Sequence, residues 1–322
     1  MRLRWVLAVA LVWGCGDDDD DDDVVVDAGY VQDRTGPPVD GFPGPDAQTN
    51  PFDDIGDVRL VDEGYEFLEG PTWRAADGVL LFSDIPADTI YQLTPPAAIE
   101  VFRMPSGNAN GLDSDADGLL LAAEHGNRRV SRTEVGGTVV DVATSYLGDR
   151  LNSPNDIAVH SDGTIYFTDP PYGIDPGDQE LSFNGVFRVP SDGGLVAEWE
   201  GALSARPNGI ALSPDEGTLY VADTAAGSVR AYALVGGALT NERVFTDATP
   251  NADGMAVDTV GNLYVTTAEG INVFAPDGTL WGTIVVPRVP ANCAFGGADA
   301  RTLYITAREG LYSVVMPIRG IP

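Results

Sequence analysis

Six oxygen-bearing side chains recur along this sequence, one at the start of each copy of a repeated pattern. The pattern is clearest over residues 207–224, PNGIALSPDEGTLYVADT, where an apolar run, a Pro-Asp-Glu-Gly turn and an alternating strand follow Asn208. Two carboxylates and several amide carbonyls form the all-oxygen set that Ca²⁺ prefers. Because none of the six is His or Cys, a dedicated zinc site is disfavoured. The six residues are Glu69, Asn110, Asn155, Asn208, Asp253 and Asn292.

The spacing of these residues predicts the fold that positions them. Neighbouring copies start 41, 45, 53, 45 and 39 residues apart, a period typical of β-propeller blades built from four short strands. We therefore predict an all-β, six-bladed propeller over residues 56–322. Equivalent positions in each blade converge on one end of the central channel. Polar side chains that bind channel waters and cap strands are the alternative interpretation of the same pattern.

The two ends of the predicted propeller contain strands that do not belong to a complete blade. Residues 58–67 (VRLVDEGYEF) precede the first copy, and residues 311–316 (LYSVVM) follow the last one. We expect the N-terminal strand to complete the final blade, which closes the ring and removes its sheet edges. The body of the chain contains no convincing amphipathic helix.

Composition limits the partners of this protein. The formal net charge is −31, and the part predicted to fold is itself acidic, which disfavours charge-driven binding to nucleic acid or anionic lipid. The only cysteines are Cys15 and Cys293. We expect Cys293 to be a small buried hydrophobic residue.

The N-terminus has the layout of an export signal. A basic start and an apolar run too short to span a membrane lead to Val12-Trp13-Gly14-Cys15, which resembles a bacterial lipobox with Cys15 as the acylated residue. Residues 16–55 are rich in Asp, Pro and Gly and are predicted to be a disordered linker. These features predict a lipoprotein of the bacterial cell envelope, periplasmic or surface-exposed, whose only membrane contact is its lipid anchor. We also expect the protein to be a monomer.

An ordered set of motifs over residues 57–317 resembles the senescence marker protein / gluconolactonase / luciferin-regenerating enzyme family, above all its bacterial gluconolactonases. The matching stretches are EGPTW at 69–73, LFSDI at 81–85, ANGL at 109–112, EH at 124–125, RRV at 128–130, RLNSPND at 150–156, FTDPPYG at 167–173, PNG at 207–209, DGM at 253–255 and ANCAFGG at 291–297. The resemblance implies hydrolysis of sugar lactones at a single divalent cation, most simply Ca²⁺, with Zn²⁺, Mn²⁺ and Mg²⁺ as alternatives.

The resemblance also implies roles for particular residues. Glu69, Asn208 and Asp253 match the family's metal ligands, and Asn155 matches an Asn that contacts metal or substrate. Asp253 also matches the proposed acid/base. Animal members have an Arg two residues before the position of Asn155, where this chain has Ser153. We predict substrate contacts from the following residues: Asn110, His125, Arg150, Asn155 and Tyr172.

Other residues admit two interpretations. His125 suits either a substrate contact or a structural hydrogen bond, whereas His160 adjoins a turn and is expected at the surface. The long interval after Asn155 predicts a loop from residue 169 to about 185, in which Tyr172 and Phe183 either wall the pocket or pack. Trp73 and Phe82 are expected between blades.

Two kinds of function fit the sequence. A lipid-anchored, metal-dependent lactonase is the preferred hypothesis, and other lactones or phosphotriesters are alternative substrates for the same site. A non-catalytic propeller that binds a glycan or a protein is the other class, because fold alone does not fix function. The joint presence of Glu69, Asn208 and Asp253 favours the enzyme.

Overall fold

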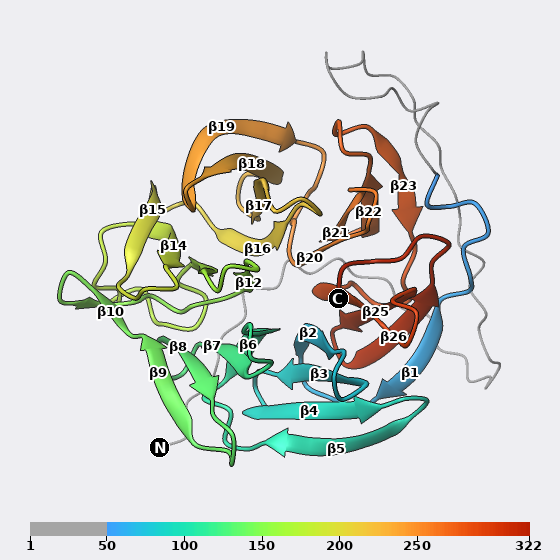
Figure 1. The fold of residues 1–322 in the computed structure, drawn as a ribbon, viewed down its shortest axis with the longest axis horizontal. Coiled ribbons are helices and arrows are strands. Elements are labelled where there is room, and N and C mark those ends of the chain that lie inside the picture. The colour runs from blue at the N-terminus through green and yellow to red at the C-terminus, as the bar shows by residue number, and fades with distance from the viewer. Residues whose placement is uncertain (1–49) are drawn as a thin grey trace, which may run out of the picture.

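The computed structural model describes residues 50–322, and their strands form a six-bladed wheel (Figure 1). This confirms the predicted all-β propeller. The predicted signal peptide with Cys15, and the linker up to residue 49, lie outside the described residues. Within residues 50–322 there is no helix, and hence none that could cross a membrane.

Each blade is a four-stranded antiparallel sheet that runs outward from the hub in chain order. Blade one contains β2 (Leu68–Arg74), β3 (Val79–Asp84), β4 (Thr89–Thr94) and β5 (Ala98–Arg103). Blade two contains β6 (Ala109–Ser114), β7 (Leu120–Glu124), β8 (Arg129–Thr133) and β9 (Val139–Ala143). Blade three contains β12 (Ile157–Val159), β13 (Ile165–Asp169), β14 (Asn184–Val189) and β15 (Val196–Gly201). A short hairpin of β10 (Ser145–Tyr146) and β11 (Asp149–Arg150) connects the second and third blades.

The remaining blades repeat this order, except that the last is completed by the start of the chain. Blades four and five are β16 (Pro207–Leu212), β17 (Thr218–Asp223), β18 (Ser228–Val235) and β19 (Ala238–Thr246), then β20 (Met255–Val257), β21 (Leu263–Thr267), β22 (Gly270–Phe274) and β23 (Leu280–Ile284). Blade six contains β24 (Asn292–Gly296), β25 (Thr302–Ala307), β26 (Gly310–Val315) and β1 (Arg59–Glu63).

β1 pairs antiparallel with β26, with Arg59 opposite Ser313 and Glu63 opposite Gly310, which confirms the predicted closure. The outermost strand of blade six therefore comes from one end of the folded region and its inner three strands from the other. Because this pairing joins the first blade to the last, it closes the ring. Phe52 and Ile55 pack against the core that blades five and six share.

The second strand of each blade forms the core. Four of these second strands are buried along their whole length, namely β3, β7, β13 and β21. Their side chains therefore fill the space between neighbouring sheets. Trp73 stacks on Tyr304 of blade six with ring centroids 5.9 Å apart, and Phe82 packs in the same cluster. Both residues lie between blades, as predicted.

The direction of the innermost strands determines which end of the channel the six polar residues occupy. Each begins at or near one of the six repeated polar residues and runs toward a turn at the opposite face. In blades two to six an Asp in this turn accepts backbone N–H groups, for example Asp115 from Leu119 at 2.8 Å. The six polar residues therefore gather at one mouth of the channel, here called the ring mouth. Loops that join the second and third strands of a blade, and loops that join successive blades, open on this same face.

Candidate active site at the ring mouth

The ring residues are buried or nearly so at the ring mouth. Glu69 is 4% exposed and Asn208 is 6% exposed, Asn110 and Asn155 are similarly buried, and Asp253 is partly buried. The Asp253 carboxylate accepts a hydrogen bond from the Asn208 amide, and the Glu69 carboxylate accepts one from Asn292. The structure thus brings residues from blades one, four, five and six into one cluster.

Glycines allow this convergence. Gly70, Gly209 and Gly254 each follow a ring residue, and a Cβ on any of them would lie about 2.0–2.1 Å from an atom of the next ring residue along the chain. Such distances are far inside van der Waals contact, so only glycine permits the innermost strands to approach this closely. The repeated acid-Gly or Asn-Gly pair is therefore a packing requirement of the hub.

The two ring carboxylates repel one another. Burial, and then the charge of Asp253, raise the pKa of the Glu69 carboxyl well above its ordinary value. Burial, and then the charge of Asp156 beneath the ring, raise the pKa of Asp253 to about 7. Because like charges are held together in a desolvated place, this cluster would gain free energy from a bound cation.

Amide and hydroxyl groups orient the ring. The Asn208 amide donates to Thr224 Oγ1 at 3.0 Å, and the Thr224 hydroxyl donates to the carbonyl of Ala252 at 2.7 Å. Together with the bond to Asp253, the bond to Thr224 uses the amide N–H groups of Asn208 and orients its side-chain carbonyl oxygen. In the next blade around the hub, the carbonyl of Asn155 accepts the Gly111 N–H at 2.7 Å, which fixes the backbone of another ring residue.

The predicted long loop, residues 170–183, delivers Tyr172 to the ring. Burial raises the pKa of the Tyr172 hydroxyl to about 12, and hydrogen bonds with the Thr224 and Asn208 side chains partly offset the rise. Tyr172 as a whole residue remains 40% exposed. Phe183, at the other end of the loop, packs against Tyr146 and Phe187 in the core and does not wall the site.

Ser153 and Arg128 hold this loop. The Ser153 hydroxyl donates to the Pro170 carbonyl at 3.1 Å and accepts the Gly173 N–H at 2.7 Å. The buried Arg128 guanidinium donates to the carbonyls of Leu151 at 2.7 Å and Asp178 at 3.0 Å, and it pairs with Glu180. Ser153, which replaces the Arg of animal members, therefore has a loop-fastening role in this chain.

The other predicted contacts lie at different places. His125 is buried, and burial lowers its pKa to about 4, so its ring is neutral and lies 3.3 Å from the Asn110 amide nitrogen. Arg150 is exposed on β11, and its backbone N–H donates to Glu180. Among the described residues, no ring side chain hydrogen-bonds Arg150. His160 lies at the opposite face beside Asp162 and Glu216.

Two arginines at the ring mouth were missed by sequence reasoning. Arg308 lies in the turn between β25 and β26, and its charge lowers the pKa of Asp253 in partial opposition to burial. Arg206 precedes β16 and lies close enough to Tyr172 to lower the pKa of its hydroxyl slightly against burial. Only Arg206-Pro-Asn208 offered a signal, since this Arg stands two residues before a ring position.

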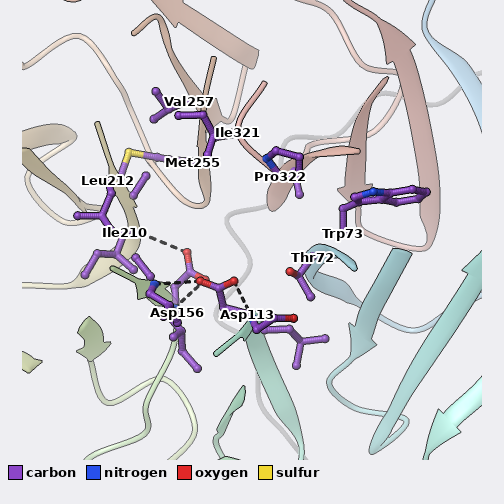
Figure 2. A pocket seen from close by; sticks show the side chains of 18 of the residues that line it. Thr72, Trp73, Asp113, Asp156, Ile210, Leu212, Met255, Val257, Ile321 and Pro322 are labelled. Carbon is purple, nitrogen blue, oxygen red and sulfur yellow. Dashed lines mark hydrogen bonds between the residues drawn. The ribbon is translucent and has the colours of Figure 1, made fainter. Parts of the chain in front are cut away.

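A separate cavity of about 520 Å³ opens at the other end of the channel (Figure 2). Asp156 and Asp113 line it, and the chain ends there at Pro322. Asp113 accepts the Val159 N–H at 3.0 Å and Asp156 accepts the Ile210 N–H at 3.3 Å, each from the following blade. These acids therefore fasten neighbouring blades together. Cys293 is buried beside them, as predicted, and burial raises its pKa.

The ring fits a hard cation. Two carboxylates supply negative charge, and the Asn155 and Asn208 carbonyls supply neutral oxygens, which is the donor chemistry of a Ca²⁺ site. Within residues 50–322 no three His, Cys, Asp or Glu side chains cluster as a metal centre. The donor set that the ring offers therefore combines carboxylate with amide oxygens.

A six-bladed propeller with a carboxylate and amide cluster at one channel mouth defines the class of protein. Residues 67–309 match the SMP-30/gluconolactonase/LRE-like region, and the chain belongs to that family. It is 37% identical over 292 residues to a gluconolactonase of Zymomonas mobilis, covering 80% of each chain. It is 28% identical to a pentonolactonase of Haloferax volcanii, covering 79% of this chain and 85% of that one.

Solved structures agree with these relatives. A gluconolactonase of Xanthomonas campestris superposes with a TM-score of 0.78 at 33% identity, covering 91% of this chain and 99% of that one. A calcium-binding regucalcin of Agrobacterium tumefaciens has a TM-score of 0.69 at 23% identity, covering 82% and 95%, and supports the fold alone.

Proposed function

We propose that this chain hydrolyses a sugar lactone to the open-chain aldonic acid at the ring mouth, with the help of one divalent cation. The observation that carries the proposal is the pair of Glu69 and Asp253, two desolvated carboxylates held together at one channel mouth. Family membership and the gluconolactonase and pentonolactonase relatives support lactone hydrolysis. The chain is therefore a hydrolase that acts on a cyclic carboxylic ester.

Glu69, Asn155, Asn208 and Asp253 would hold the cation, and Ca²⁺ is the ion we favour. When bound, the cation supplies Lewis-acid polarisation of the lactone carbonyl. Hydrogen bonding to Asn208 keeps the Asp253 carboxylate aimed into the site. The amide ligands add no charge, so the cluster balances a doubly charged ion with two carboxylates.

Asp253 is the proposed acid/base. Its carboxylate takes a proton from water as the water oxygen attacks the lactone carbonyl carbon. Collapse of the resulting tetrahedral carbon breaks its bond to the ring oxygen, and protonated Asp253 returns the proton to that oxygen. The product is the free acid with a new hydroxyl group, and Asp253 is restored.

Neighbouring side chains would orient the sugar. Asn110 and neutral His125 present donors and acceptors beside the ring, and the Asn155 carbonyl accepts the N–H of Gly111, which follows Asn110. Tyr172 would cover the substrate from the 170–183 loop, with its hydroxyl near Asn208. Arg150 would reach the lactone hydroxyls only from the exposed hairpin.

The proposed cellular location rests on the N-terminal sequence. Acylation of Cys15 would tether a monomeric propeller to the bacterial envelope through the acidic linker of residues 16–55. Detergent phase partitioning of the full chain tests this, because a lipoprotein enters the detergent phase. A Cys15→Ala variant that partitions like the parent would contradict it.

A pH-indicator assay of lactone opening tests the function. We expect glucono-δ-lactone to open faster than its spontaneous rate, the excess to vanish with a chelator, and Ca²⁺ to restore it. Activity unaffected by exhaustive chelation would refute the cation. Absence of activity across a broad lactone panel, with a cation bound, would favour a propeller that binds a glycan or protein.

A further inference from the structure

Arginines without acidic partners occur at the ring mouth of a strongly acidic protein. The chain has 18 basic residues against 49 acidic ones, and most described arginines pair with a carboxylate, as Arg188 does with Glu198 and Arg230 does with Glu242. Within residues 50–322, Arg206 and Arg308 make no ion pair. An arginine that stays unpaired amid excess carboxylates has donors available for a ligand.

The local structure fixes Arg308 beside the cation ligands. Its carbonyl accepts the Leu68 N–H at 2.8 Å, and Leu68 directly precedes Glu69. Its guanidinium lies over the Phe67 ring, 4.9 Å from the centroid, and the side chain is half-buried. Its backbone has a φ of 55°, an uncommon conformation that a non-glycine residue retains only when its surroundings impose it. Stacking on Phe67 orients the guanidinium while leaving its N–H edge free.

Arg206 is fixed beside another ligand. Its carbonyl accepts the Thr224 N–H at 3.0 Å, and Thr224 also accepts the Asn208 amide. The backbone N–H of Arg206 donates to the Asp223 carboxylate, and one guanidinium nitrogen donates to the carbonyls of Leu203 and Ala205. Within residues 50–322 the rest of the guanidinium makes no hydrogen bond, and it lies near the hydroxyl of Tyr172.

We propose that Arg308, assisted by Arg206, forms an anion subsite that selects lactones carrying a negatively charged group away from the reacting carbonyl. This inference rests on the proposed function and specifies its substrate class. A carboxylate, sulfonate or phosphate at the far end of the sugar has the chemistry that a guanidinium edge recognises. A cation held by Glu69 and Asp253 would balance their negative charges, so these two carboxylates would no longer repel an anionic group that approaches Arg308 and Arg206.

The test compares an anionic with a neutral lactone. We expect kcat/KM to be higher for glucaro-lactone, which carries a carboxylate, than for glucono-δ-lactone. Arg308→Gln should lower the anionic-to-neutral ratio about tenfold or more, as expected for loss of a hydrogen bond to a charged group. Arg308→Lys should retain part of the ratio. Arg243→Gln is the matched control, because Arg243 also stacks on an aromatic ring, Phe245, and makes no ion pair within residues 50–322.

Three outcomes overturn the subsite. The first is a wild-type enzyme without preference for the anionic lactone. The second is an equal loss on both lactones in Arg308→Gln, which would mean that Arg308 acts only on Asp253. The third is an equal change in Arg243→Gln. If no lactone is opened, the proposed function fails by itself, and calorimetric binding of glucarate against gluconate then decides whether Arg308 selects the second carboxylate.

Discussion

Glu69 and Asp253 are held where neither carboxylate is well solvated and each opposes ionisation of the other. Proteins tolerate such an arrangement when another charge compensates it or when it serves function. Arg308 compensates only in part, because it makes no ion pair with either carboxylate within the described residues. A bound cation would compensate the remaining negative charge of the two carboxylates. Its positive charge would then also be available to polarise the lactone carbonyl.

Replacing Asp253 by Asn removes the proposed base and one ligand charge while keeping the side-chain shape. We expect kcat on glucono-δ-lactone to fall by roughly 100-fold or more, the lower range for loss of a general acid/base. Asp113→Asn is the control, since Asp113 lies in the opposite cavity and should leave turnover close to wild type. Near-wild-type kcat in the Asp253→Asn protein would remove Asp253 from the mechanism.

Glu69→Gln separates repulsion from cation binding. In chelator the variant should melt at a higher temperature than wild type, because the buried repulsion with Asp253 is gone. Added Ca²⁺ should raise the melting temperature of wild type, since a ligand of the native state stabilises it, but not that of the variant. Differential scanning calorimetry measures both shifts. Equal Ca²⁺ stabilisation of the two proteins would contradict the ligand role of Glu69.

The loop that carries Tyr172 depends on Arg128. One guanidinium binds the carbonyl of Leu151, which precedes β12, and that of Asp178, in the loop between β13 and β14. The single ammonium group of a lysine cannot reach both of these carbonyls at once. We therefore expect Arg128→Lys to raise KM several-fold with a smaller effect on kcat, and to expose the 170–183 loop to protease. Arg132→Lys, at a surface ion pair on β8, is the control and should change neither quantity. An unchanged KM would show that the loop does not need this contact.

The repeat made the elements predictable, and its absence explains what was missed. Innermost strands, the closing β1 and the loop after β13 all follow from period, alternation and composition. Arg308 and Arg206 follow no repeat, because residues in the turns vary from blade to blade. The contact between Arg308 and Leu68 joins the two ends of the folded chain, and no local pattern reports such a contact. The sequence shows that Ser153 departs from the family pattern. Its hydrogen bond to the Pro170 carbonyl, 17 residues along the chain, is visible only in the structure.

Buried acids give the whole molecule an unusual pH dependence. Burial raises the pKa of both Asp113 and Asp169 to about 7 from 3.8. Between these values the folded state binds protons that the unfolded state releases, so stability falls as pH rises through this window. His125 acts oppositely: burial lowers its pKa to about 4 from 6.5, so its contribution is lost as pH falls.

Asp156 and Asp253 have a pKa raised in the same way. Because these carboxyls outnumber the one imidazole, we expect the chelated protein to be more stable near about pH 5.5 than near about pH 7.5. Thermal melts at constant ionic strength measure this. Asp169→Asn should flatten the dependence, because an amide does not titrate. A melting temperature that rises steadily across the same interval would show that these carboxyls are ionised in the folded protein.

The location of the cation is the central claim, and anomalous diffraction from crystals soaked in Mn²⁺ locates it most directly. We predict one strong anomalous peak at the ring mouth, within coordination distance of oxygens from Glu69, Asn155, Asn208 and Asp253. A peak elsewhere, or a ring that stays free of metal at saturating Mn²⁺, would contradict the account.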